Sequence, residues 1–180
     1  MQNPIIAALD VPTAEQALKL AQEIAPAVGA FKIGKELFTS AGPDIVKRVR
    51  DTGASVFLDL KFHDIPNTVA KAIAAAVRLD VQMVTIHTSG GSEIMRAAEQ
   101  AAQQTALQAG RNAPLVLGVT VLTSHDANTL ATVRPPPSPV MKSIRPRRDL
   151  QSHANHLPGG RTCALLRSPL STGAFPYWPP

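Results

Sequence analysis

The chain has 180 residues, 44% of them hydrophobic, which is enough for one domain with a substantial core. No apolar run approaches the roughly 20 residues of a membrane-spanning helix, the first residues do not form a secretory signal, and the single cysteine, Cys163, excludes an intrachain disulfide. We therefore expect a cytoplasmic protein. The net charge of +5 belongs to the C-terminal part, because residues 1–132 carry 11 Lys+Arg and 12 Asp+Glu, whereas residues 133–180 carry 7 and 1.

Five apolar runs of β type recur along the chain, and segments with helical spacing separate them. The runs lie at 5–9, 30–33, 55–60, 82–87 and 115–122. The helices are expected at 13–24, 43–49, 67–79 and 92–110. Pro43 suits the first turn of the second helix, and the other three are expected to be capped by Thr13, by either Asn67 or Thr68, and by Ser92. This alternation predicts β/α units around a parallel sheet, which is an α/β fold.

The most informative segment is 59–68, where two carboxylates and an ammonium follow the third apolar run. Side chains alternate between the faces of a strand, so Asp59 and Lys61 share one face, about 6.6 Å apart along the strand. A buried carboxylate needs a partner, which makes Lys61 the expected partner of Asp59 and makes Asp64 a second carboxylate for Lys61. Such an array could donate a proton and repel a substrate anion. The alternative is a solvated ion pair, which contributes less than about 1 kcal/mol.

The regular alternation stops near residue 131. Residues 132–180 contain 10 of the 16 prolines and the only Trp and Tyr, and no further β/α unit can be drawn there. We divide the chain into a β/α domain at 1–131 and an irregular Pro/Arg-rich tail at 132–180. Translation in a shifted reading frame is the favoured explanation of the tail, with a native disordered segment as the alternative. The basic stretch at 145–148 could bind nucleic acid, but a solvated basic stretch is favoured.

The stretch from Asp59 to Thr68 has the pattern DxKxxDIxNT, and the segments 9–11, 31–34 and 121–124 follow a matching pattern at the ends of the first, second and fifth strands. Over residues 4–131 the chain thereby resembles the orotidine 5′-phosphate decarboxylase family. The resemblance implies a (β/α)8 TIM barrel of which about the first five β/α units are present. It also implies conversion of orotidine 5′-phosphate to UMP and CO2 in pyrimidine biosynthesis, with no metal or organic cofactor.

The resemblance implies a role for each matching charged residue. Lys61 would protonate C6 of the pyrimidine as CO2 departs, and Asp59 would face the substrate carboxylate and help to keep Lys61 charged. Lys32 would join this network and contact the ribose, while Asp10 would bind the ribose hydroxyls. Asp64 would complete the array in the neighbouring subunit's site, so that a homodimer is part of the active unit.

The same resemblance places four further residues at the substrate. Thr68 would approach the ribose or phosphate of the partner subunit's substrate, Ile65 belongs to the substrate-binding set, and Thr123 and Ser124 would lie near the pyrimidine. His87 could face the site, although a structural histidine is the favoured interpretation. His63 is expected to be a loop residue beside the motif, and the glycines at 90–91 form either a turn or an anion-binding nest.

Two parts of the family pattern, a glutamine-bearing lid and a late Gly-x-Arg phosphate motif, have no counterpart in the sequence. We therefore predict little or no decarboxylase activity for the 180-residue chain, and an inactive truncated or frameshifted product is one alternative. Sugar-phosphate decarboxylases and hexulose-phosphate synthases share the DxKxxD pattern and form the other alternative. The segment 65–68 favours the orotidine branch.

Overall fold

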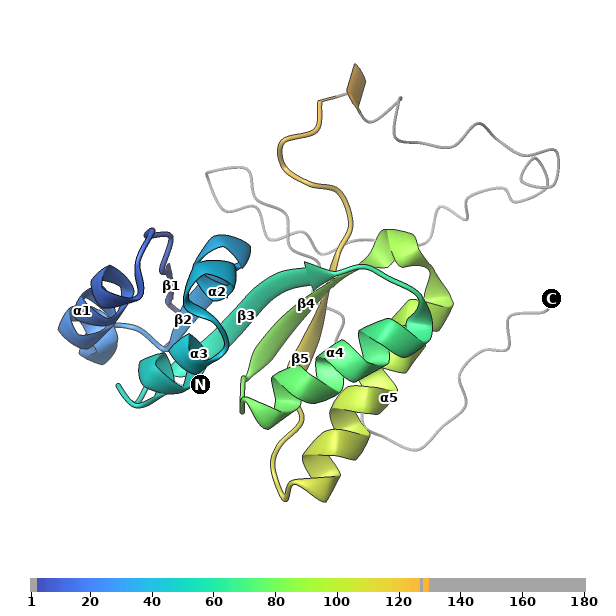
Figure 1. The fold of residues 1–180 in the computed structure, drawn as a ribbon. Helices are drawn as coiled ribbons and strands as arrows, with labels where there is room; N and C mark the ends of the chain where they lie inside the picture. The colour runs from blue at the N-terminus through green and yellow to red at the C-terminus, as the bar shows by residue number, and fades with distance from the viewer. Residues whose placement is uncertain (1–2, 127, 130–180) are drawn as a thin grey trace, which may run out of the picture.

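The computed structural model describes residues 3–126 and 128–129, which form a parallel sheet with helices (Figure 1). Five strands lie side by side in chain order: β1 (Ile6–Ala8), β2 (Ala30–Gly34), β3 (Ser55–Phe62), β4 (Met83–His87) and β5 (Leu115–Val119). Each strand pairs in parallel with the next. The five predicted strands are therefore confirmed, although β5 ends at Val119, before the predicted end at residue 122.

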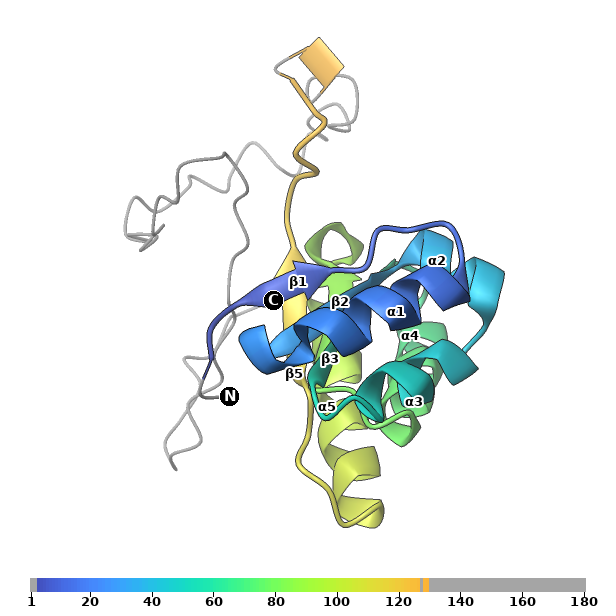
Figure 2. The same cartoon turned by 90° about the vertical axis from the view of Figure 1, so that its left-hand side faces the viewer.

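The helices connect the strands and all lie on one side of the sheet (Figure 2). They are α1 (Ala14–Ile24), α2 (Lys35–Ala41), α3 (Asp44–Arg50), α4 (Pro66–Arg78) and α5 (Ser92–Gln108), with short 3-10 turns η1 (Ala25–Ala27) and η2 (Thr88–Gly90). This arrangement is the α/β fold predicted from the sequence, with four β/α units of a barrel and a fifth strand among the described residues. No helix in the described ranges is long and apolar enough to cross a membrane.

The helix starts agree with the sequence only in part. Thr13 caps α1, because its side chain accepts a hydrogen bond from the backbone N–H of Gln16 at 3.3 Å. The prediction that Asn67 or Thr68 caps α4 is wrong: the helix begins at Pro66, with Ile65 as the cap residue. Proline suits the first helical position because its fixed φ is helical and its missing N–H would have no partner there.

Two other helix assignments are corrected. Ser92 is the first residue of α5, and Gly91, at φ 88, is the cap. The helix α2 was not predicted at all. It has seven residues and buries only Leu37, so it carries too few apolar positions to show a helical period.

The main core lies between the helices and the sheet. Its large, fully buried side chains come from alternate strand positions and from the facing helices; they include Phe31, Ile33, Leu58, Ile86, Val46 and Ile73. On the opposite face of the sheet a smaller cluster joins Ala30, Met83 and Leu117, with Phe57 partly buried against it. This second face is the interior side of the partial barrel, and the charged residues of the motif occupy the ends of its strands.

The predicted tail at 132–180, with Cys163 and the basic stretch at 145–148, lies outside the described residues.

Candidate active site

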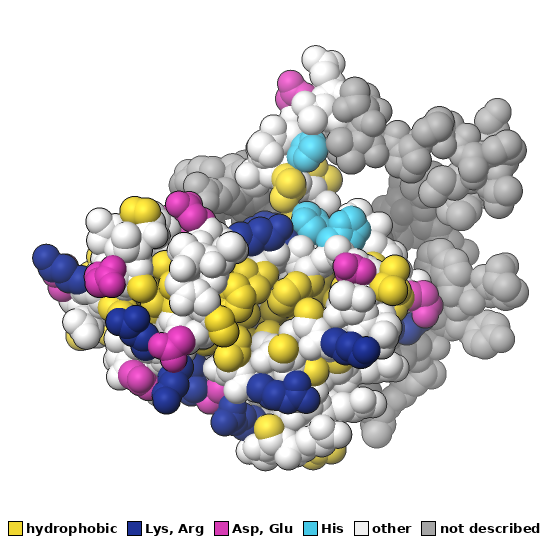
Figure 3. Space-filling model, viewed as in Figure 1, with side chains coloured by type: hydrophobic (Ala, Val, Ile, Leu, Met, Phe, Trp, Pro, Cys, Tyr) yellow, Lys and Arg dark blue, Asp and Glu magenta, His cyan; other side chains and the backbone are white. Residues whose placement is uncertain are grey.

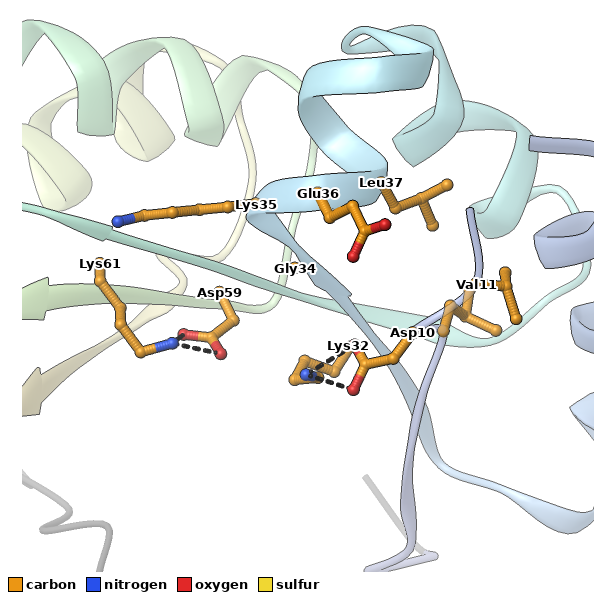
Figure 4. Close-up of a pocket in the computed structure, with 10 residues that line it drawn as sticks. Asp10, Val11, Lys32, Gly34, Lys35, Glu36, Leu37, Asp59 and Lys61 are labelled. Carbon is orange, nitrogen blue, oxygen red and sulfur yellow. Dashed lines mark hydrogen bonds and ion pairs between the residues drawn. The ribbon is translucent and has the colours of Figure 1, made fainter. Parts of the chain in front are cut away.

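A pocket lies where β1, β2 and β3 end, which is the edge of the sheet at which (β/α)8 barrels carry their active sites. Four of the predicted site residues line it: Asp10, Lys32, Asp59 and Lys61 (Figure 4). Its volume is about 200 Å³, smaller than the roughly 300–1,000 Å³ of most small-molecule sites. The described residues therefore enclose only part of a nucleotide-sized ligand.

The ion pair expected between Asp59 and Lys61 is present. The ammonium of Lys61 lies 2.8 Å from Oδ1 and 2.7 Å from Oδ2 of Asp59, so one cation contacts both carboxylate oxygens. The side chains are 28% and 14% exposed, respectively, which is far more buried than a solvated surface pair. The pair is held in a partly dry pocket, where charge interactions are stronger than in water.

The backbone of β3 is irregular at this pair. Leu58 faces Val84 in the register with β4, but the next pair is Phe62 with Ile86, so residues 59–61 face one residue, Thr85. Within this bulge Lys61 has φ 52, a left-handed conformation that is costly for a residue with a Cβ. The expected regular alternation is thus interrupted, and the bulge re-aims the Lys61 side chain toward Asp59.

Thr85 is a site residue that the sequence reasoning missed. Its side chain is 1% exposed, accepts a hydrogen bond from the backbone N–H of Lys61 at 2.8 Å, and donates one to Oδ1 of Asp59 at 2.9 Å. A single threonine hydroxyl therefore links both members of the ion pair. The one sequence indication is a polar residue at the centre of the apolar run 83–86.

A second ion pair lines the same pocket. The ammonium of Lys32, on β2, lies 3.0 Å and 3.2 Å from the two carboxylate oxygens of Asp10. The N–H of Leu9 donates to the carbonyl of Lys32 at 3.0 Å, and this bond brings Asp10 beside β2. Asp10 is 62% exposed, so its carboxylate can receive a ligand, while Lys32 is 22% exposed. The fold thus brings Asp10 and Lys32, both predicted from the sequence, together in the pocket.

The remaining predicted residues do not line the pocket. The carboxylate of Asp64 accepts a hydrogen bond from the N–H of Ile65 at 2.7 Å, and no contact with Lys61 is present among the described residues, which corrects the expectation that Asp64 reaches Lys61 within one chain. Ile65 is 65% exposed, and the N–H of Thr68 donates to the Ile65 carbonyl in the first turn of α4.

The residues Thr123 and Ser124 lie in an exposed turn after β5, which the N–H of His125 closes by donating to the carbonyl of Leu122 at 3.0 Å. Neither residue is among those that line the pocket. Their expected place near the pyrimidine stays a prediction.

Two histidines lie next to the pocket. The rings of His63 and His87 are 5.2 Å apart and tilted by 49°, and Figure 3 shows histidine side chains gathered beside a basic side chain on this face. Burial lowers the pKa of His87 below its ordinary 6.5; the nearby charges of His63, Lys35 and Lys61 lower it further, while Asp59 opposes them. His87 is therefore held toward its neutral form.

The glycines at 90–91 form a turn after β4. The N–H of Gly91 donates to the carbonyl of Thr88 at 3.0 Å, and its φ of 88 is a conformation that glycine adopts readily. Across residues 3–126 and 128–129, no group of three or more His, Cys, Asp or Glu side chains could hold a metal ion.

Comparison with known proteins gives one consistent family. The model of the "Orotidine 5′-phosphate decarboxylase / HUMPS family" matches residues 3–157, so the match continues beyond residue 131. A protein of Pseudomonas putida (strain GB-1) named orotidine 5′-phosphate decarboxylase is 44% identical over 176 residues, covering 97% of this chain and 72% of that protein. Another of that name from Pseudomonas fluorescens (strain SBW25) is 51% identical over 132 residues, covering 73% of this chain and 55% of that protein.

Among solved structures, the orotidine 5′-phosphate decarboxylase of Lactobacillus acidophilus superposes with a TM-score of 0.66 at 36% identity. The match covers 73% of this chain and 59% of that one. This chain thus spans between about half and three quarters of the length of these relatives. The parallel sheet, the paired charges at its carboxyl edge and these matches agree, and the chain belongs to the orotidine 5′-phosphate decarboxylase / HUMPS family.

Proposed function

We propose that the pocket between β1, β2 and β3 binds orotidine 5′-phosphate and decarboxylates it to UMP and CO2, a step of pyrimidine biosynthesis. The observation that carries this proposal is the Lys61 ammonium held against both oxygens of Asp59 in a half-buried pocket. The names of the relatives at 44% and 51% identity support the substrate assignment.

The chemistry follows from these two groups. The bond between C6 and the carboxylate carbon breaks, its electron pair stays at C6, and CO2 leaves. The Lys61 ammonium then gives a proton to C6 and becomes a neutral amine that solvent reprotonates. At 4 Å a cation and a developing anion attract by about 1 kcal/mol in water but by about 4 at an effective dielectric of 20, so exclusion of water strengthens this step.

Asp59 has two tasks in this proposal. Its charge keeps Lys61 protonated, and it disfavours a substrate carboxylate bound close by. Binding energy from the rest of the substrate offsets that repulsion, which is relieved as CO2 departs. Asp10 and Lys32 would supply part of that binding through the ribose.

The proposal includes a homodimer. Asp64 and Thr68 do not line the pocket of their own chain, and Asp64, Ile65 and Thr68 lie around the start of α4, where Ile65 exposes 65% of its surface. An exposed apolar side chain beside a carboxylate that forms no ion pair with another described residue suits a surface that meets a second subunit.

The proposal also assigns Thr123 and Ser124 to contacts with the pyrimidine. A cytoplasmic location is part of the same proposal.

We expect the 180-residue chain to turn over slowly, because the pocket that its described residues form encloses only about 200 Å³. Single-turnover measurements, with the chain in excess over substrate labelled at the carboxylate, would detect slow release of labelled CO2. No release above the rate without protein would refute the proposed reaction, and near-normal turnover would refute the expected impairment. Competition by a pentulose 5-phosphate, but not by UMP, would instead assign the pocket to a sugar-phosphate enzyme.

A further inference from the structure

We propose that Thr85 is a positioning residue of this site: its hydroxyl holds the Lys61 backbone and the Asp59 carboxylate in the one arrangement that presents the ammonium to the substrate. The expected effect of Thr85 on catalysis rests on the proposed function. Its effect on the positions of the Lys61 backbone and the Asp59 carboxylate rests only on contacts within the chain.

The first argument comes from the backbone. In a regular ladder the N–H of each β3 residue that points at β4 would find a β4 carbonyl, but three residues of β3 face the single residue Thr85. The N–H of Lys61 instead donates to the Thr85 hydroxyl at 2.8 Å. A partly buried N–H without a partner would be unfavourable, so this hydroxyl stabilises the bulge.

The second argument comes from strain. Lys61 has φ 52, a conformation that is unfavourable for a residue with a Cβ and that persists only where its surroundings hold it. The hydrogen bond from Lys61 N–H to Thr85 ties down the strained residue itself. Without it, the bulge can relax and carry the ammonium away from Asp59.

The third argument concerns the other side of the hydroxyl. The Thr85 oxygen accepts a hydrogen bond from the Lys61 N–H, which leaves the hydroxyl proton available for donation. The hydroxyl donates this proton to Oδ1 of Asp59 at 2.9 Å. The same oxygen of Asp59 accepts from the Lys61 ammonium at 2.8 Å. The hydrogen bonds therefore form a closed ring. It runs from the Lys61 N–H to the Thr85 hydroxyl, from there to the Asp59 carboxylate, and back to the ammonium of Lys61.

Burial supports this assignment. Thr85 is 1% exposed on the interior face of β4, and a buried hydroxyl is retained at such a position only when it is hydrogen-bonded. Valine has the same shape without the donor and acceptor, so Thr85→Val removes both bonds and keeps the volume. Thr85→Ser keeps the hydroxyl and removes a methyl group.

The test compares the unaltered chain with Thr85→Val, Thr85→Ser, and Thr105→Val as a matched control on α5, where a threonine 8% exposed lies away from the pocket. In single-turnover decarboxylation, Thr85→Val should lower the rate at saturating substrate by about 10- to 100-fold with less than about 3-fold change in the half-saturating concentration. Thr85→Ser should stay within about 3-fold of the unaltered chain, and Thr105→Val should not change the rate.

A second measurement reports on the geometry without activity. Hydrogen exchange at the Lys61 amide, followed by NMR, should speed up by at least about 10-fold in Thr85→Val and not in Thr85→Ser, while the Leu58 amide is unchanged. Should Thr85→Val fail to fold, Thr85→Ala against Thr85→Ser isolates the hydroxyl in the same way.

The outcomes separate the two proposals. If the unaltered chain releases no CO2, the proposed function fails, and the exchange of the Lys61 amide alone decides the assignment of Thr85. Unchanged exchange at Lys61 in Thr85→Val overturns the assignment. So does a Thr85→Val variant that keeps the full rate in an active chain, or a Thr85→Ser variant that is as slow as Thr85→Val.

Discussion

The Lys61 ammonium lies 2.7 Å and 2.8 Å from the two oxygens of Asp59, although Lys61 itself occupies a left-handed backbone conformation. A strained residue thus carries the cation, and the carboxylate two positions earlier on the same strand orients it. This pair is the centre of the proposed reaction. The strained backbone conformation of Lys61 is part of the arrangement that directs its ammonium toward Asp59.

Replacing Lys61 by alanine should remove the proton donor. We expect the single-turnover rate to fall by about 10²- to 10⁴-fold, the usual contribution of a general acid. Release of labelled CO2 measures it. Lys71→Ala, on an exposed position of α4, is the matched control and should keep the rate of the unaltered chain. Equal rates in the two variants would remove Lys61 from the mechanism.

Replacing Asp10 by asparagine should weaken nucleotide binding. The change keeps the side-chain size but removes the charge that pairs with Lys32 and that is proposed to accept the ribose hydroxyls. A hydrogen bond to a charged group contributes about 1.5–3 kcal/mol, so UMP should bind roughly 10- to 150-fold less tightly. Calorimetric titration with UMP measures this. Asp51→Asn, on an exposed position after α3, should bind UMP as the unaltered chain does.

Mixing two inactive variants tests the shared site. If Asp64 serves the partner subunit's pocket, a dimer of one Lys61→Ala chain and one Asp64→Ala chain has one pocket with both changes and one with neither. Random pairing should then restore about a quarter of the rate of the unaltered chain, because half of the dimers carry one intact pocket. The rate is measured after the two purified chains are mixed and allowed to exchange subunits. A mixture no faster than either variant alone would contradict a site built from two chains.

Acid should destabilise the chain through His87. Its pKa is lowered in the folded state, chiefly by burial, so between that lowered pKa and the ordinary 6.5 the unfolded chain binds more protons than the folded chain. The contribution of His87 to the free energy of unfolding is therefore complete above pH 6.5 and is lost as the pH falls through this window. Urea unfolding at several pH values measures it.

Two variants refine this expectation. His87→Gln should flatten the dependence of stability on pH below pH 6.5, because the titrating group is gone. His63→Gln should flatten it less, because it removes one neighbouring charge and raises the pKa of His87 toward its ordinary value while leaving the burial that is the larger cause. A slope that is unchanged in His87→Gln would assign the acid sensitivity to another group.

Asp80 offers a test of backbone strain far from the pocket. It has φ 61 and pairs with Arg50 at 2.6 Å, and Arg111 lies 3.9 Å away. Asp80→Gly and Asp80→Ala both remove the carboxylate, but only alanine keeps a Cβ in the left-handed conformation. We expect Asp80→Ala to be less stable than Asp80→Gly by about 1 kcal/mol, measured by urea unfolding. The reverse order would mean that the left-handed conformation at position 80 does not destabilise a residue with a Cβ.

The sequence by itself determined the β/α repeat, the five strands and the position of the charged motif. These are local properties: apolar periodicity identifies a strand or helix, and Asp59 and Lys61 are close enough in the chain for their pairing to be predicted. The bulge through which they pair was not predicted. Helix ends were less predictable. The misassigned start of α4 shows that a polar residue after proline competes with proline itself for the start of the helix.

Only the tertiary structure decided how the site is held together. Thr85 is 24 residues from Lys61 and 26 from Asp59, and Asp10 is 22 residues from Lys32. These contacts depend on which residues face each other across β1, β2, β3 and β4, and the register of β3 changes by a bulge that no local pattern indicates. Periodicity shows which face a side chain occupies within one strand, whereas a hydrogen bond between strands requires the alignment of two segments, which packing of the whole sheet sets.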